Sequence, residues 1–133
     1  MATGGIEDGN PPLEAGISQA DMDYLHIFDI KKMTDAVAAG KTDLINGFPV
    51  ISLETAATEG ILHFAPEPKS PHGADVTPDG EFVVVSGKLD PHVTVYSVPK
   101  IKAAIAAGTD ERDVFGVGIL DFDTVVEVQV EVG

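Results

Sequence analysis

A tight-turn signal between two short apolar runs most constrains the fold of this chain. Pro78-Asp79-Gly80 separates residues 73–77 (GADVT) from residues 82–86 (FVVVS). Proline presets one backbone angle, aspartate bonds to nearby backbone, and glycine adopts the positive φ that closes tight turns. The flanking runs have the β-branched and aromatic content of strands. The sequence therefore predicts an antiparallel hairpin in the middle of the chain.

Other segments extend this pattern in both directions. Strand-like composition also occurs at residues 24–30, 61–65, 92–98 and 125–132, the last alternating valine with polar residues as in a strand with one wet face. Helical spacing predicts short helices over residues 31–39 and 99–107, each ended by a glycine. We expect a loose leader over residues 1–20 and a folded, mostly β domain with short helical inserts over residues 21–133.

The two strand-helix pairs resemble each other. The shift along the sequence that superposes Tyr24 on His92 also superposes Gly40 on Gly108, without a gap between them. One explanation is composition, because alanine-rich helices that end in glycine look alike. The other is an internal repeat, and a repeat of this length with an inserted helix suits a β-propeller blade. On that reading the chain forms about one and a half blades of a β-propeller.

Charge and cysteine content limit the possible partners. The chain has 22 acidic against 8 basic side chains, a net charge of −14, which repels nucleic acid and anionic membrane surfaces. The same acidic excess is tolerated in concentrated salt, which predicts a halophilic source. Because cysteine is absent, a soft-metal site here must use histidine. No apolar run is as long as a membrane span, and we expect any export signal to lie outside this chain.

His72 is the strongest candidate for metal chemistry. It stands directly before the first strand of the predicted hairpin. In a propeller the innermost strand of each blade begins near the central channel, where imidazoles from several blades could hold copper or a similar metal. The alternative is that His72 has a structural role and only makes hydrogen bonds. The spacing of residues alone does not distinguish this role from metal binding. We expect His26 and His63 to be packing or surface residues, His92 to be solvated, and Lys88 to be a surface charge.

Four segments together resemble one blade of nitrous oxide reductase: residues 70–73 (SPHG), 77–80 (TPDG), 86–91 (SGKLDP) and 93–95 (VTV). The resemblance covers nearly the whole chain after Asp21. It implies a seven-bladed propeller with a C-terminal cupredoxin domain, which in denitrification reduces nitrous oxide to dinitrogen at a sulfide-bridged copper cluster held by histidines. It implies that His72 is one of those copper ligands. Asp23 matches an acidic calcium-binding position, with a solvated turn aspartate as the alternative.

The resemblance also implies an electron donor such as cytochrome c or a cupredoxin, a homodimer, and a periplasmic or other extracytoplasmic location. With the acidic composition it implies a haloarchaeal source. Ser70 and Asp90 depart from the family, which usually has asparagine and serine there. The remaining cluster histidines and the cupredoxin domain are not in this sequence, so we expect a fragment that is inactive alone. The alternative is a non-catalytic propeller scaffold for binding, built from Pro-Asp-Gly hairpins.

Overall fold

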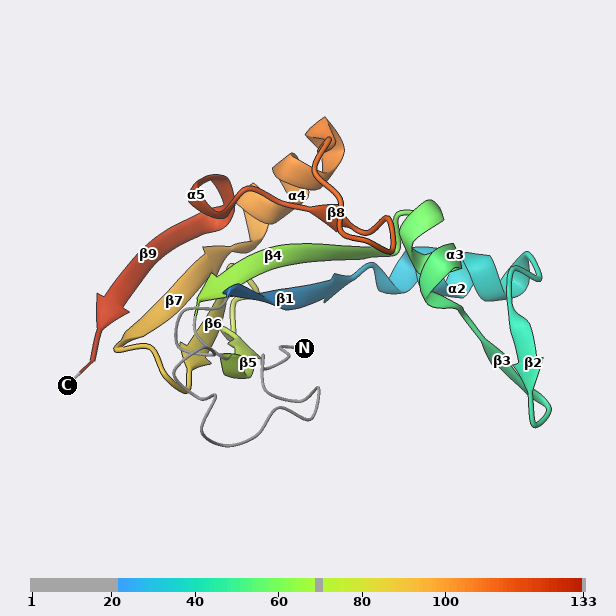
Figure 1. Cartoon of the computed structure of the whole chain (residues 1–133), viewed down its shortest axis with the longest axis horizontal. Helices are drawn as coiled ribbons and strands as arrows, with labels where there is room; N and C mark the ends of the chain where they lie inside the picture. The colour runs from blue at the N-terminus through green and yellow to red at the C-terminus, as the bar shows by residue number, and fades with distance from the viewer. Residues whose placement is uncertain (1–21, 69–70, 133) are drawn as a thin grey trace.

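The computed structural model describes residues 22–68 and 71–132, and these form a β-rich chain (Figure 1). The predicted leader over residues 1–20 lies outside the described residues. The described strands form a three-stranded sheet in the order β1-β4-β8, a two-stranded sheet β2-β3 and a four-stranded sheet β5-β6-β7-β9. The strands of the first and third sheets are β1 (Met22–Phe28), β4 (Leu62–Pro68), β8 (Gly118–Ile119), β5 (Pro71–Val76), β6 (Phe82–Gly87), β7 (His92–Ser97) and β9 (Val126–Glu131).

The hairpin predicted from the central turn is confirmed. Strand β5 pairs antiparallel with β6, and β7 pairs antiparallel with the other edge of β6. At the turn the Gly80 N–H donates to the Thr77 carbonyl (2.8 Å), and Gly80 has a φ of 73°. The Asp79 carboxylate accepts from the Thr77 hydroxyl (2.6 Å) and the Glu81 N–H (3.0 Å). The aspartate and the glycine therefore act as the turn pattern requires.

Both predicted helices are present, and each begins at an N-cap residue. Helix α2 (Ile30–Ala38) follows β1, and its N-cap Asp29 accepts from the Lys32 N–H (3.0 Å). Helix α4 (Val98–Ala107) follows β7, and its N-cap Ser97 accepts from the Lys100 N–H (3.3 Å). The shift that aligns the two sequences also superposes one N-cap on the other. Helices α3 and α5 also begin at a serine or aspartate N-cap, so capping by itself does not decide between a repeated strand-helix unit and similarity of composition.

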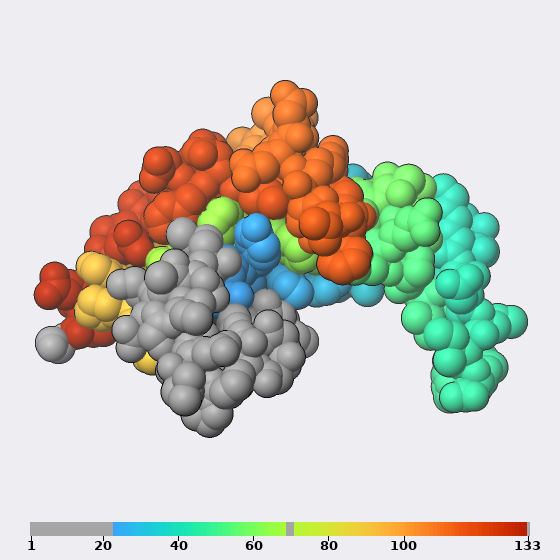
Figure 2. Space-filling model, in the orientation of Figure 1, coloured from blue at the N-terminus to red at the C-terminus, as the bar shows by residue number. Residues whose placement is uncertain are grey.

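A second hairpin was not predicted. Strands β2 (Asp43–Ile45) and β3 (Phe48–Val50) pair antiparallel across Asn46 and Gly47, whose φ angles of 52° and 82° define a type I′ turn. Asn-Gly between apolar residues is the sequence signal for this turn. Helix α3 (Leu53–Thr58) follows and leads back to β4. Figure 2 shows that this hairpin stands away from the rest of the molecule.

The last predicted strand begins later than expected. Val125 belongs to the short helix α5 (Phe122–Val125), where its side chain is fully buried, and β9 starts at Val126. The burial of β9 also differs from a strand with one dry face. Its valines at 128 and 130 are 47% and 48% exposed, although they alternate with polar residues. The alternating pattern is therefore present, but the described residues do not cover its apolar side.

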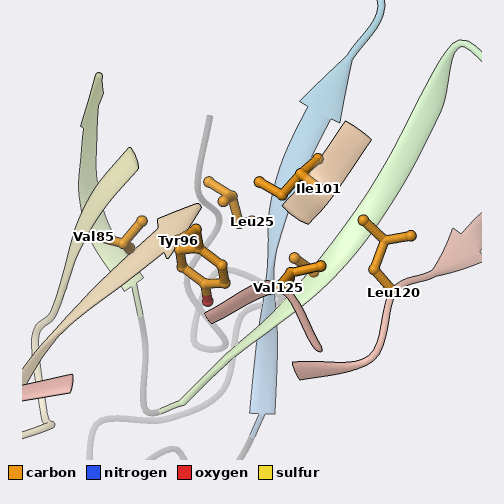
Figure 3. Close-up of a cluster of buried hydrophobic side chains, with 7 residues drawn as sticks. Leu25, Val85, Tyr96, Ile101, Leu120 and Val125 are labelled. Atoms are coloured by element: carbon orange, nitrogen blue, oxygen red, sulfur yellow. The ribbon is translucent and has the colours of Figure 1, made fainter. Parts of the chain in front are cut away.

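A buried apolar cluster joins the three-stranded sheet to the four-stranded sheet (Figure 3). The three-stranded sheet contributes Leu25 and Ala65, and the four-stranded sheet contributes Val85 and Tyr96. The remaining members are Ile101, Leu120 and Val125. A second cluster fixes the helices α2 and α3 to β4 and β8; it consists of Ala36, Ala56, Ile61, Leu62, Phe64, Val117 and Ile119. The described helices are all too short or too polar to cross a membrane.

Candidate functional site

His72 occupies a β-bulge at the start of the edge strand β5. The pairing between β5 and β6 steps from Pro71 opposite Gly87 to Gly73 opposite Ser86, so His72 has no residue opposite it. A bulge residue leaves the regular alternation of the strand, and bulges are common where a side chain must be redirected at a functional site. The His72 side chain is exposed. A Cβ built on the next residue, Gly73, would meet no heavy atom of the other described residues within 4 Å.

This geometry suits one copper ligand but does not form a complete site. Imidazole is a suitable donor for copper, and His72 presents it at an accessible sheet edge. Within residues 22–68 and 71–132, however, no three histidine, cysteine, aspartate or glutamate side chains are grouped to hold a metal ion. A cluster that includes His72 therefore requires donors from beyond the part of the chain that the structure describes.

Asp23, the candidate calcium ligand, lies near the start of β1. Its cross-strand partner is Glu67 of β4, so two carboxyl groups occupy directly opposite positions. Such a pair is stable when one carboxyl is protonated or when a cation lies between them, and carboxylate oxygens suit calcium. Ser70, where the sequence departs from the family it resembles, lies outside the described residues. The calcium role of Asp23 stays a prediction.

Glu67 is a buried ionisable residue that was not predicted from the sequence. It is 0% exposed, and burial raises the pKa of its carboxyl to about 7, opposed by hydrogen bonds from Tyr96 and Thr94 and reinforced by the charge of Asp90. The Tyr96 hydroxyl bonds this carboxyl and also donates to the Pro66 carbonyl (2.6 Å). Burial and the neighbouring carboxyl raise the pKa of Tyr96 as well. The sequence signal that could have indicated it is a glutamate in the strand-like segment 62–68, where leucine, phenylalanine and proline occupy every second position.

The histidines of β1 and β4 have packing environments. The His26 ring stacks on Phe64, with 4.7 Å between ring centroids, and meets Phe28 edge-on. Burial lowers the pKa of His26. His63 lines a cavity of about 380 Å³ between β1 and α4, and burial together with the charges of Lys32 and Arg112 lowers its pKa. The expectation that both rings are packing or surface residues is confirmed.

The His92 side chain is 38% exposed, which agrees with the expectation of a solvated ring. His92 begins β7, as predicted, and its Nδ1 lies 2.9 Å from the Asp90 carboxylate, whose side chain is only 4% exposed. The His92 backbone N–H also donates to this carboxylate (3.2 Å). Asp90 therefore anchors the start of the strand through its side chain. Lys88 is exposed in the turn before it, as expected for a surface charge.

These features define the class of the molecule: a β-rich chain of strand-helix units with an exposed histidine at a sheet-edge bulge. No protein-family model matches the sequence. Curated relatives do match. The chain is 28% identical to the nitrous-oxide reductase of Pseudomonas fluorescens over 65% of its residues, and 29% identical to that of Stutzerimonas stutzeri over 74%. The nitrous-oxide reductase of Ralstonia nicotianae is 26% identical over 86% of the chain.

The chain is therefore a nitrous-oxide reductase-related region. This relationship indicates an oxidoreductase-related origin. The match spans only 14% to 17% of the length of these relatives. The activity of the whole relative is consequently a proposal for the protein that contains this chain.

Proposed function

We propose that this chain is part of a copper-dependent nitrous oxide reductase and that His72 supplies one imidazole to its copper cluster. The bulge at His72 carries the proposal, because it presents an exposed imidazole at the start of an edge strand. The relationship to nitrous-oxide reductases supports copper as the metal and nitrous oxide as the substrate.

The arrangement of strands supports a propeller architecture for that protein. Four antiparallel strands in the order β5-β6-β7-β9 have the number and pairing of a propeller blade, with β5 as the innermost strand. Strands β1 and β4 then correspond to the outer two strands of the preceding blade, since β1 is the repeat equivalent of β7. In this arrangement His72 lies at the channel, where histidines of other blades converge. The chain contributes about one and a half blades.

The proposed reaction converts nitrous oxide, two protons and two electrons into dinitrogen and water. The copper cluster would bind and activate nitrous oxide, and a cytochrome c or cupredoxin would supply the electrons. Within this chain, the bulge orients the His72 imidazole. One histidine cannot fix a cluster, so the isolated chain has no turnover. The homodimer, the extracytoplasmic location and calcium at Asp23 belong to the same proposal.

The test uses the full-length protein that contains this region, with His72→Ala. We expect loss of the cluster copper and of nitrous oxide turnover, while copper in the electron-transfer centre is retained. His92→Ala is the matched control, because His92 lies in the same sheet but is bound to Asp90. Normal copper loading and turnover in His72→Ala would contradict the proposal. A full-length protein with further blades but without copper would instead favour a binding scaffold.

A further inference from the structure

The tip of the β2–β3 hairpin has a sequence that favours a chemical modification of the chain itself. The chain contains two asparagines, Asn10 and Asn46, which precede Pro11 and Gly47. When glycine follows asparagine, the glycine backbone nitrogen reaches the asparagine side chain easily, because no Cβ hinders the approach. Proline has no backbone N–H, so Asn10 cannot react in this way. The sequence therefore singles out Asn46.

The structure leaves this hairpin tip without packing. The three residues of β2 and the three residues of β3 are all exposed, and the hairpin stands away from the rest of the molecule (Figure 2). A Cβ built on Gly47 would meet no heavy atom of the other described residues within 4 Å. The type I′ turn fixes the backbone angles, with a φ of 52° at Asn46, so the reaction requires the turn to open. A two-stranded hairpin is only marginally stable in water, so opening breaks few contacts.

The central turn of the chain is held much more firmly. There Asp79 precedes Gly80, which also has a positive φ of 73°. The Asp79 carboxylate accepts from the Thr77 hydroxyl (2.6 Å) and from the Glu81 N–H (3.0 Å), and the flanking strands belong to the four-stranded sheet. The strands beside Asn46 pair only with each other. Of these two turns, the one at Asn46 is therefore the easier to open.

We propose that Asn46 is a deamidation site and that the β2–β3 hairpin is modified there while the rest of the chain stays folded. The Gly47 backbone nitrogen forms a bond to Cγ of Asn46, the bond between Cγ and Nδ2 breaks, and ammonia leaves with the proton that the Gly47 nitrogen loses. Water then opens the resulting succinimide ring at either carbonyl, which gives aspartate or isoaspartate. Water is the only co-reactant, so the reaction is independent of copper and of His72.

The modification changes the hairpin and leaves the core in place. Both products add a negative charge between Ile45 and Phe48, whose side chains are 53% and 71% exposed. Isoaspartate also adds a methylene group to the main chain, which a two-residue turn between these paired residues cannot accommodate. We therefore expect the isoaspartate form to lose the pairing of β2 with β3. Neither buried cluster includes a residue of these two strands, so both clusters should persist.

The test compares the folded chain in concentrated potassium chloride with the same chain unfolded in urea, both at physiological temperature. Trypsin releases residues 42–69, in which Asn46 has the only amide side chain, and residues 1–31, which contain Asn10. We expect the first peptide to gain about 1 Da and to separate into two isomers of equal mass. Its rate in the folded chain should lie within about tenfold of the rate in urea, because the turn opens locally. Asn10 should keep its amide in both states.

Isomerisation of Asp79, followed in the tryptic peptide of residues 70–88, is the internal control. The salt concentration is raised until folding slows this reaction about a hundredfold, which shows that the central turn is formed. Asn46→Gln is the matched variant, because it keeps the amide but would have to form a larger and slower-closing ring. A folded chain that slows the Asn46 reaction as much as the Asp79 reaction overturns the proposal. Equally fast loss of the amide from Asn46→Gln also overturns it, since the Gly47 nitrogen would then not be the attacking group.

Discussion

Tyr96 of β7 and Glu67 of β4 are hydrogen-bonded to each other in the buried space between the two larger sheets. The Tyr96 oxygen lies close to two acceptors, the Glu67 carboxyl and the Pro66 carbonyl (2.6 Å). A phenol has one hydrogen, so it cannot donate fully to both. If Glu67 is protonated, its O–H donates to Tyr96 and Tyr96 donates to Pro66. This arrangement gives the Tyr96 hydroxyl one donor and one acceptor, and it agrees with the raised pKa of Glu67, whose Oε1 is buried without a hydrogen-bond partner among the described residues.

The first prediction concerns stability against pH. The pKa of Glu67 is about 7 in the folded chain against 4.5 for the free side chain, so the folded state holds the extra proton between these values. The protonated Glu67 therefore contributes its full share to the free energy of unfolding below about pH 4.5. This contribution is lost as the pH rises through about 7. The loss is on the order of 3 kcal/mol. Glu67→Gln should remove it, because an amide donates to Tyr96 at every pH.

Urea unfolding at acidic and alkaline pH checks this expectation. Wild type should be less stable at alkaline pH than Glu67→Gln, and the two should be similar at acidic pH. Glu127→Gln is the control, because this exposed β9 glutamate pairs only at the surface with Lys100. Parallel stability profiles for wild type and Glu67→Gln would show that Glu67 is ionised in the folded chain.

The second prediction concerns salt. With a net charge of −14, repulsion between acidic side chains destabilises the compact chain, and the exposed valines of β9 favour aggregation. We expect the isolated chain to be marginally stable or insoluble in dilute buffer and to gain stability in molar potassium chloride, where screening is short-ranged. Thermal unfolding and sedimentation across a salt series measure both effects. A cooperative, monomeric transition in dilute buffer would rule this out.

The elements predicted from sequence are those with local causes. The turn at residues 78–80 and the helices that begin after Asp29 and Ser97 depend on residues close in sequence, and the structure contains all three. The hairpin at Asn46 and Gly47 also has a local signal, but its strands are three residues long and exposed, so the segments that flank the turn lack the length of a core strand.

The interactions that were not predicted depend on distant residues. Glu67 and Tyr96 are 29 residues apart, and nothing local indicates that they meet. The bulge at His72 depends on the register between two strands, which the sequence of one strand does not determine. The position of His72 at the start of a strand could be predicted from the sequence. Its exposure, and the absence of a β6 residue directly opposite it, could not be predicted.

The third prediction concerns the central turn. Gly80 has a φ of 73°, and a Cβ built there meets no heavy atom within 4 Å. Gly80→Ala therefore costs only backbone strain, about 1 kcal/mol, and lowers the melting temperature. Gly73→Ala is the matched control, because it has equally open space without a positive φ and should change stability little. Equal melting temperatures for the two variants would mean that the turn relaxes to another conformation.

The fourth prediction concerns copper in the isolated chain. The described residues group no three metal-ligating side chains, and His72 is exposed at its bulge, so residues 22–68 and 71–132 do not supply a complete copper site there. Metal sites gain strength and selectivity from several donors held in a fixed geometry. We therefore expect the chain to lose added copper on desalting, and His72→Ala to behave in the same way. Copper retained at one equivalent by wild type but not by His72→Ala would show that this chain supplies a complete site.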